Sequence, residues 1–417
     1  MLRFAPSPTH DMHIDELRVA ILSYLVAQQK QERFIVRIDD MDKEKVIEGK
    51  DTEMMQILEK FALTHDTVLH QSEKLHLYQT LAIGLLEKNK AFVCTCGDEA
   101  LKNAHYSGRC FEADKEELNK LKDSGTAFVV RIKKPDTPII FDDAIRGEIK
   151  TAPDEIDSLV ILGADGTPTH DFASACADML MGVTMILSTG EDIIHTAKQK
   201  HITMQLGYEE ETEYAHLPAL VGEVENLTVK WLFEQGFIPD AIINYLLLLG
   251  YTDAPCQIFT LPEAITWFKL ENISKDAVTF DMEKLRFINK KHLEKVNDRD
   301  LSTLFGFADA AIGKLAKLYL EEVSTMKELE AKIHPIFAPK DFEGVFGAEM
   351  RTLEEIIQNA PMIERFEDFK HYMLKQSGFE AGHFFKPLRL LLTGAEYGPE
   401  LCDIYPLIKP YLLEIAS

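Results

Sequence analysis

Short apolar runs and helical repeats alternate over the first 90 residues of the chain. The runs "LRFAPS" at residues 2–7 and "FIVRI" at 34–38 are rich in β-forming residues and show little alternation, which is typical of buried parallel strands. Residues 16–29 and 48–61 carry apolar side chains at helical spacing. The order strand, helix, strand, helix predicts a doubly wound sheet that binds its ligand at the carboxyl ends of its strands.

The pattern changes near residue 91. The segments "FVCTC", "FVVRIKK" and "PIIFDDAIRGEIK" predict antiparallel strands, with a charged helix over 112–122, and we interpret them as an insertion. The α/β pattern returns near Ser158, where Asp165-Gly166 predicts a hairpin turn. After Val229 the periodicity predicts helices almost throughout. The expected fold is therefore an α/β domain split by an α+β insertion, followed by an all-helical C-terminal half.

Composition and charge narrow the class of protein. No apolar window approaches the roughly 20 residues of a membrane span, and "AIINYLLLLG" at 241–250 indicates a buried helix. The start of the chain does not resemble a signal peptide, and six cysteines without a framework spacing favour a reducing compartment, so we expect a cytoplasmic protein without membrane contact. The net charge of −24 argues against a general attraction for nucleic acid. Local basic segments at 131–134 and 284–291 are the exceptions, and each is typical of a solvated face.

Several motifs follow one another in an order that resembles a known family. These are "RFAPSPT", "MHI", "FIVRIDDMD", "GTPTHDFA", "DMLMGVT", "GED", "YAHLP", "VKWLFEQGFIPDAIINYLLLLGY", "FDMEKLRFINKKH" and "FFKPLRLLLTGAEYGPEL". Together they cover nearly the whole chain and resemble the glutamyl-tRNA synthetases, class I aminoacyl-tRNA synthetases, most of all the shorter bacterial type. The resemblance implies a Mg-ATP-dependent attachment of glutamate to a tRNA of the glutamate or glutamine type, through a glutamyl adenylate.

The resemblance also implies a domain order. The two halves of a Rossmann-type catalytic domain would be residues 1–90 and 158–228. An insertion similar to the family's acceptor-end-binding domain would be residues 91–157. A helical region similar to its stem-contact region would be 229–300, and a helical domain similar to its anticodon-binding domain would be 301–417.

The first family signature, a glycine-containing turn that meets the ATP phosphates, is altered. His13 of "HI" remains as the residual catalytic group, but His10, Asp15 and Glu16 replace the glycines that let a nucleotide approach. At an effective dielectric of about 20, one carboxylate about 4 Å from a phosphate costs on the order of 4 kcal/mol. A helix cap or first-turn acid is the competing interpretation of Asp15 and Glu16.

The second signature, a lysine-rich loop after "HLP", is missing. The sequence "GEVEN" at 222–226 fills a shortened connection, and no Lys or Arg occurs between Lys200 and Lys230. By resemblance, the substrate-binding residues would be Arg3, Ser7, Asp39 (which would receive the ammonium group), His170 (in place of a tyrosine), Glu191 and Asp192. Thr189 stands where the family has an arginine.

Two metal sites are conceivable. Cys94-x-Cys96, with Tyr106 and Cys110 downstream, resembles a zinc site of some family members, with His105 as a competing fourth ligand. The alternative is a set of reduced thiols in a small hairpin. The cluster His10, Asp11, His13, Asp15 and Glu16 contains suitable ligand types, although a solvated acidic turn accounts for it better.

Three hypotheses remain open from the sequence. The chain is a glutamate–tRNA ligase with weakened motifs, a catalytically silent relative that binds tRNA or a protein partner, or a different enzyme that uses a metal at the His10/His13/Asp15 turn. Family identity favours the first hypothesis. The altered residues favour the second, because the phosphate loop, the pocket arginine and the glycine turn are lost together.

Overall fold

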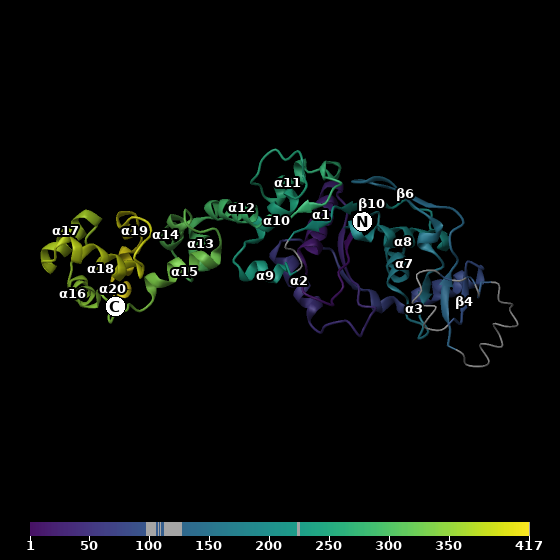
Figure 1. Cartoon of the computed structure of the whole chain (residues 1–417), viewed down its shortest axis with the longest axis horizontal. Coiled ribbons are helices and arrows are strands. Elements are labelled where there is room, and N and C mark those ends of the chain that lie inside the picture. The colour runs from purple at the N-terminus through teal and green to yellow at the C-terminus, as the bar shows by residue number, and fades with distance from the viewer. Residues whose placement is uncertain (97–105, 107, 109, 112–126, 223–225, 417) are drawn as a thin grey trace. The chain divides into compact units, whose positions relative to one another are not determined.

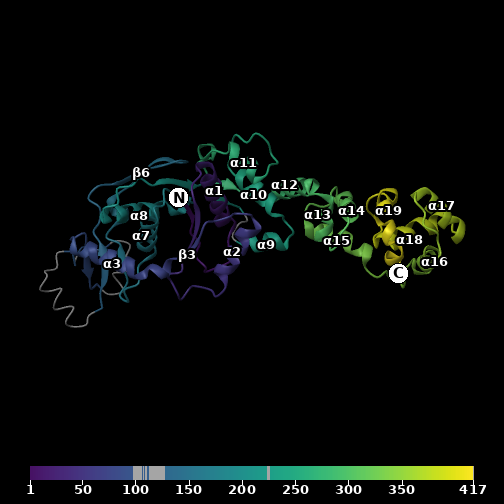
Figure 2. The same ribbon diagram turned by 180° about the vertical axis from the view of Figure 1, so that it is seen from behind.

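The structure, a computed structural model, divides into two compact units. It describes residues 1–96, 106, 108, 110, 111, 127–222 and 226–416. One unit, called here the sheet unit, comprises Met1–Lys230 and Ile243–Phe280, and the other, the helical unit, comprises Trp231–Ile242 and Asp281–Ser417. Figures 1 and 2 show the chain from opposite sides.

The sheet unit is built on a seven-stranded sheet with the strand order β3-β2-β1-β9-β10-β6-β7. Neighbouring strands run parallel, except that β7 at the edge pairs antiparallel with β6. The strands are β1 (Leu2–Phe4), β2 (Phe34–Ile38), β3 (Val68–His70), β6 (Ile139–Asp143), β7 (Gly147–Thr151), β9 (Met185–Thr189) and β10 (Glu213–Leu217). Every residue of β1 and β2 is buried, as expected for central parallel strands. The predicted parallel α/β sheet is confirmed.

Helices link these strands, and several of them pack on the sheet. Helix α1 contacts β1 and β9, and α8 lies beside α7 and contacts β6 (Figures 1 and 2). The helical segments are α1 (Ile14–Lys30), α2 (Lys50–Lys60), η1 (Gln71–Lys74), α3 (Leu75–Glu87), α6 (Pro153–Ile156), α7 (His170–Met181), η2 (Gly190–Asp192), α8 (Ile193–Leu206), α11 (Leu261–Trp267) and η3 (Leu270–Asn272). A separate short pair of parallel strands is formed by β11 (Leu220–Val221) and β12 (Val278–Thr279).

A second, three-stranded sheet has the order β4-β5-β8, with antiparallel pairs of β4 (Ala91–Cys94), β5 (Val129–Ile132) and β8 (Val160–Leu162). Two of our strand interpretations are corrected here. The hairpin β6–β7, which we assigned to the insertion, extends the main sheet, where Phe141 packs on Tyr214 with ring centroids 5.0 Å apart. Strand β8, which we expected in the main sheet, pairs with β5 instead. The expected helix at 112–122 lies outside the described residues.

The chain from residue 282 to 416 is helical, as predicted. Its segments are α12 (Met282–Lys295), α13 (Asp298–Leu304), α14 (Ala311–Tyr319), α15 (Met326–Phe337), α16 (Gly347–Gln358), α17 (Phe366–Ser377), α18 (Ala381–Thr393), α19 (Leu401–Ile408), η4 (Lys409–Tyr411) and α20 (Leu412–Ile415). The last three segments, α19, η4 and α20, follow one another directly, with Pro410, which lacks a backbone N–H, in the middle one.

The most apolar segment of the chain is a buried helix. Helices α9 (Val229–Glu234) and α10 (Pro239–Leu248) are separated by a connection that contains Gly236. Residues 241–249 are all buried, which confirms the expected buried helix. Among the described residues, none of the helices combines the length and the apolarity that a membrane crossing requires.

Candidate functional site

A cavity of about 220 Å³ lies at the carboxyl ends of β1, β2 and β9 in the sheet unit, the edge at which parallel α/β sheets bind ligands. It is lined by Arg3, Phe4, Ala5, Pro6, Glu16, Val19, Arg37, Asp39, His170, Ser174, Leu187, Ser188, Thr189, Asp192, His195, Thr196 and Gln199. Six of the residues singled out from the sequence line it: Arg3, Glu16, Asp39, His170, Thr189 and Asp192. The structure thus brings together residues that are far apart in the sequence.

Two arginines and two aspartates form a buried network beneath the cavity. The Arg37 guanidinium donates to Asp39 (Nε–Oδ1 2.6 Å, Nη2–Oδ2 3.0 Å) and to Asp178 (Nη1–Oδ1 2.5 Å). Arg3 donates to the same Asp178 through Nε (3.2 Å) and Nη2 (3.1 Å). Burial alone would raise the pKa of the Asp178 carboxyl, but the charges of Arg3 and Arg37 outweigh it and lower that pKa. The two positive and two negative charges therefore compensate each other inside the protein.

Helix α7 forms one wall of the cavity. His170, Ser174 and Asp178 recur at every fourth position and therefore lie on one helix face. Ser174 Oγ lies 3.4 Å from Asp39 Oδ2, and His170 Nε2 lies 3.9 Å from the same oxygen. The predicted ammonium acceptor, Asp39, is thus already surrounded by groups of the protein.

The sequence did not reveal the pair of His195 and Asp171, of which His195 lines the cavity. His195 Nδ1 is 2.7 Å from Asp171 Oδ1, and the hydrogen bond that it donates to Asp171 raises the pKa of the His195 imidazole. Burial alone would raise the pKa of Asp171, but hydrogen bonds from His170 and His195 lower it. The only sequence signal for His195 is its place one helical turn after "GED".

The side chains of the altered turn before α1 form hydrogen bonds within the turn and with the start of the helix. Glu16 Oε2 accepts the His13 backbone N–H at 2.8 Å and lies 3.2 Å from His10 Nε2. His13 Nδ1 accepts the Asp15 N–H at 3.3 Å, so both side chains cap the helix. Asp11 pairs with Lys50, and this ion pair lowers the pKa of the Asp11 carboxyl. The helix-cap interpretation of Glu16 therefore agrees with the contacts it makes.

Other sequence-selected residues lie outside the cavity lining. Ser7 follows the lining segment at 3–6, and the exposed Glu191 is not part of the wall.

Thr189, which lines the cavity, is hydrogen-bonded to Asp192. The Thr189 backbone N–H and the Thr189 hydroxyl donate to Asp192 Oδ2 at 3.1 Å and 2.9 Å. Sequence reasoning also missed Arg146, which donates to the His216 carbonyl at 3.2 Å and packs against Gly190, where a side chain would collide with it.

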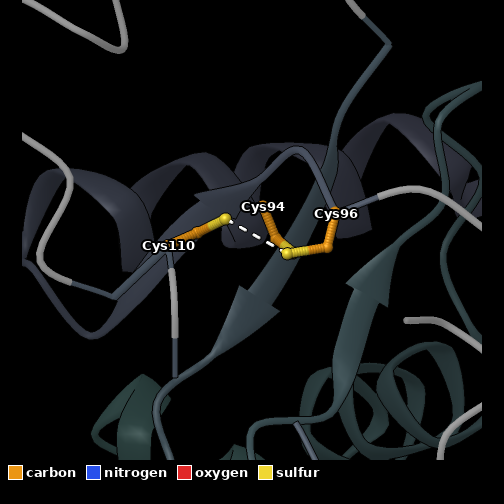
Figure 3. A group of neighbouring side chains, drawn as sticks. All are labelled: Cys94, Cys96 and Cys110. Atoms are coloured by element: carbon orange, nitrogen blue, oxygen red, sulfur yellow. Dashed lines mark hydrogen bonds between the residues drawn. The ribbon is translucent and has the colours of Figure 1, made fainter. Parts of the chain in front are cut away.

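The three cysteines of the second sheet converge. Their sulfur atoms lie within 4.8 Å of one another, and Cys96 Sγ is 3.4 Å from Cys110 Sγ (Figure 3). The Tyr106 hydroxyl accepts the Cys110 backbone N–H at 2.6 Å. In the part of the chain that the structure describes, this is the one group of three or more His, Cys, Asp or Glu side chains close enough to share a metal ion. The cluster at residues 10–16 does not form such a group, and His105 lies outside the described residues.

Comparison with known proteins agrees with the fold and the motifs. A family model for the catalytic domain of class I tRNA synthetases (E and Q) matches residues 1–287. Glutamate--tRNA ligase 2 of a Sulfurovum species is 58% identical in an alignment over 429 residues that covers 100% of both chains. Glutamate--tRNA ligase 1 of a Nitratiruptor species is 46% identical with the same full coverage.

A solved structure shares the fold. The crystal structure of a glutamate tRNA ligase from Elizabethkingia meningosepticum has a TM-score of 0.81 at 24% identity, and the match covers 99% of this chain and 97% of that one. The family model spans more than half of the chain, and the curated relatives align over its whole length. The resemblance seen in the sequence is confirmed, and the chain belongs to the bacterial glutamyl-tRNA synthetase family.

Proposed function

We propose that this chain keeps the amino-acid pocket and the tRNA-binding scaffold of its family, but that its activation of glutamate with Mg-ATP is weak or lost. The relatives named above are glutamate–tRNA ligases, so glutamate, ATP and a tRNA of the glutamate or glutamine type are the expected ligands. The affected step is the first one, in which ATP must be held while charge develops on its phosphates.

The observation that carries this proposal is the position of the Glu16 carboxylate. Glu16 lines the cavity and accepts the His13 N–H at 2.8 Å. A helix N-terminus normally offers its N–H groups and its partial positive charge to a phosphate. Here a carboxylate of the same helix already uses that position, so a phosphate would meet a negative charge in place of a free donor.

A shortage of cations supports the same conclusion. No Lys or Arg occurs between Lys200 and Lys230, the segment in which the family carries its lysine-rich loop. Residues 223–225 of the connection "GEVEN" lie outside the described residues. The alignment with the Sulfurovum relative runs over 429 residues, more than the 417 of this chain, so that relative has residues without a counterpart here. A shortened connection accounts for such a difference.

The amino-acid pocket keeps its main binding residues, but their hydrogen bonds within the protein reduce what they can offer a ligand. Arg3 uses Nε and Nη2 for Asp178 and keeps Nη1 for a ligand carboxylate. Asp39 would receive the ammonium group, but both of its oxygens already accept from Arg37, which weakens it as an acceptor. Ser7, Glu191 and Asp192 remain proposals taken from the family pattern. We keep the domain roles in the same way, with the part of 91–157 outside the β6–β7 hairpin near the tRNA acceptor end and 301–417 near its anticodon.

We also propose a structural zinc ion at the cysteine cluster. Zinc–sulfur bonds of about 2.3 Å put the sulfurs of a tetrahedral site about 3.8 Å apart, which agrees with three sulfurs within 4.8 Å. Burial alone would raise the pKa of Cys110, but hydrogen bonds from the Thr95 backbone and from Tyr106 lower it to about 7, which favours a thiolate. Cys94, Cys96 and Cys110 would hold the ion, with Tyr106 as the fourth donor. Such an ion would link the end of β4, at Cys94 and Cys96, to the turn at Cys110.

Glutamate-dependent exchange of pyrophosphate into ATP, measured with tRNA present, tests the proposed loss of activation. We expect little or no exchange while tRNA binding persists in a filter-binding assay. Turnover at the rate of a relative such as the Nitratiruptor protein would contradict the proposal. In that case the exchange rate of the Arg146→Ala variant should be measured. A loss of exchange in this variant would identify Arg146, which lies beside Gly190 next to the cavity, as the source of the positive charge.

A further inference from the structure

The strongest positive charges at the cavity are already neutralised by the protein itself. The side chain of Arg37 is 2% exposed and contacts Asp39 and Asp178. Arg3, 10% exposed, shares Asp178 with it. Since the two arginines are balanced by two carboxylates, the network as a whole attracts a ligand anion only weakly. A pocket for an acidic ligand needs a further cation.

His195 has the geometry of that cation. Its Nδ1 is 2.7 Å from Asp171 Oδ1, so the Nδ1–H is directed to Asp171 and the Nε2 side of the ring is left for a ligand. The imidazole lines the cavity and is 45% exposed, whereas Asp171 is 13% exposed and therefore well fixed. A carboxylate that holds one ring nitrogen both orients the ring and favours its protonated form.

The charged neighbours of His195 favour this assignment. The His170 ring stands perpendicular to it with centroids 6.4 Å apart, and both rings line the cavity. The Asp192 carboxylate is engaged by the Thr189 N–H and hydroxyl. Lys198 Nζ lies 4.0 Å from Asp171 Oδ2, but Lys198 is not part of the cavity lining. The cation nearest to the ligand space on this wall is therefore an imidazole.

We propose that His195, positioned by Asp171, binds the side-chain carboxylate of the amino-acid ligand and so determines the preference of this pocket for an acidic over a neutral side chain. The inference rests on the proposed function only in taking glutamate as the ligand. It requires binding of glutamate, and it does not require activation. Because an imidazole loses its charge above its pKa, glutamate binding should weaken as the pH rises.

Isothermal titration with glutamate and with glutamine, in the absence of ATP, tests this assignment between pH 6 and 8.5. The side-chain carboxyl of glutamate stays ionised over this range, so a pH effect specific to glutamate reports on the protein. We expect the affinity for glutamate to fall roughly tenfold or more with rising pH, and the affinity for glutamine to change little. His195→Gln should lose roughly tenfold to a hundredfold in glutamate affinity at pH 6 and become insensitive to pH.

His195→Lys separates charge from fold, because it should restore glutamate binding without a dependence on pH in this range. His76→Gln, at an exposed histidine of α3, is the matched control and should behave like the wild type. Equal glutamate affinity of His195→Gln and wild type would overturn the assignment. So would a wild type that binds no glutamate at pH 6. Neither outcome depends on pyrophosphate exchange. Equal affinities would overturn this assignment alone, whereas a wild type without glutamate binding would also overturn the retained amino-acid pocket.

Discussion

The Asp39 carboxylate lies against the Arg37 guanidinium in a two-point contact, with Nε–Oδ1 at 2.6 Å and Nη2–Oδ2 at 3.0 Å. Residues two apart in an extended strand point to the same face, so this pairing follows from their spacing at the end of β2. The contact converts what the family pattern marks as a ligand-binding acid into part of a buried network. Asp178 completes that network, and its removal gives the first prediction.

Asp178→Asn should destabilise the protein by about 3–5 kcal/mol, because it leaves two buried arginines with one carboxylate between them. Urea unfolding followed by circular dichroism measures the change. Glu343→Gln is the control, since Glu343 pairs with Arg351 at the surface, 89% exposed, and its loss should change stability little.

The same network predicts how the stability of the protein changes at low pH. The pKa of Asp178 is lowered in the folded state, so its contribution to stability is complete above about pH 4, the unfolded-state pKa, and is lost as the pH falls through the folded-state pKa. Stability of the Asp178→Asn variant should therefore depend less on pH below 4 than that of the wild type. Identical acid profiles would show that other carboxylates dominate.

Two substitutions at Glu16 should separate charge from capping. Glu16→Gln keeps an oxygen for the His13 N–H, whereas Glu16→Ala removes it. Both should raise the affinity for Mg-ATP roughly tenfold, since a negative charge is removed. Only Glu16→Ala should lose stability, by about 1 kcal/mol. Equilibrium dialysis with labelled ATP and thermal melts measure the two effects, and unchanged ATP binding in Glu16→Gln would exclude electrostatic repulsion by this side chain.

The His195–Asp171 pair should stabilise the fold in a defined pH window. The pKa of His195 is raised, so its contribution is present below about pH 6.5 and is lost as the pH rises through the folded-state value. The pKa of Asp171 is lowered, so its contribution is present above about pH 4. The Tm difference between wild type and Asp171→Asn should therefore be greatest between about pH 4 and 6.5 and shrink above it. A difference that grows toward pH 8.5 would contradict this pairing.

Metal analysis should find one zinc ion per purified chain. Cys110→Ser should abolish the binding, and a chelator should lower the Tm of the wild type. Cys256→Ser and Cys402→Ser, at exposed thiols outside the cluster, serve as controls and should retain full zinc content. A wild type free of zinc, with a Tm unaffected by chelation, would leave the thiols as ordinary packing groups.

Two glycines with the same backbone angle offer a matched test of packing in the helical unit. Gly236 and Gly306 both have φ +84°, and a Cβ at Gly306 meets nothing within 4 Å. A Cβ at Gly236 collides with the backbone of Lys327 and lies 2.9 Å from Met326 N. Gly306→Ala should cost about 1–2 kcal/mol for its left-handed backbone, and Gly236→Ala roughly twice that or more. Equal costs in urea unfolding would mean that the first turn of α15 shifts easily to make room for the added methyl group.

Local patterns predicted the elements better than the contacts between them. Strand β2 was predicted to the residue because a run of buried β-formers is a local signal. Helix α1 begins at Ile14, before the predicted start, because the capping residues around it carry no apolar repeat. Strand β8 was expected in the wrong sheet, because three apolar residues can pair with any free edge and only the tertiary structure decides which.

The candidate site shows the same limit. The family pattern pointed to Arg3, Asp39 and His170, and all three line one cavity. It pointed to His195 only through its place after "GED", because its partner Asp171 lies 24 positions earlier and the contact forms only when α7 packs beside α8. A lone histidine carries no periodicity or motif, so its chemistry becomes visible only through its neighbours.

The spacing of four residues between His170, Ser174 and Asp178 on α7 has a consequence for how the sequence of this helix can vary in the family. His170 and Ser174 line the cavity, and Asp178 contacts the two arginines beneath it, because each of the three lies about one turn beyond the last. Inserting or deleting a single residue between them would rotate every later side chain by about 100° and swing Asp178 away from both arginines. Natural variants should therefore exchange side chains along this stretch while keeping its length constant, and indels should accumulate in the connecting loops.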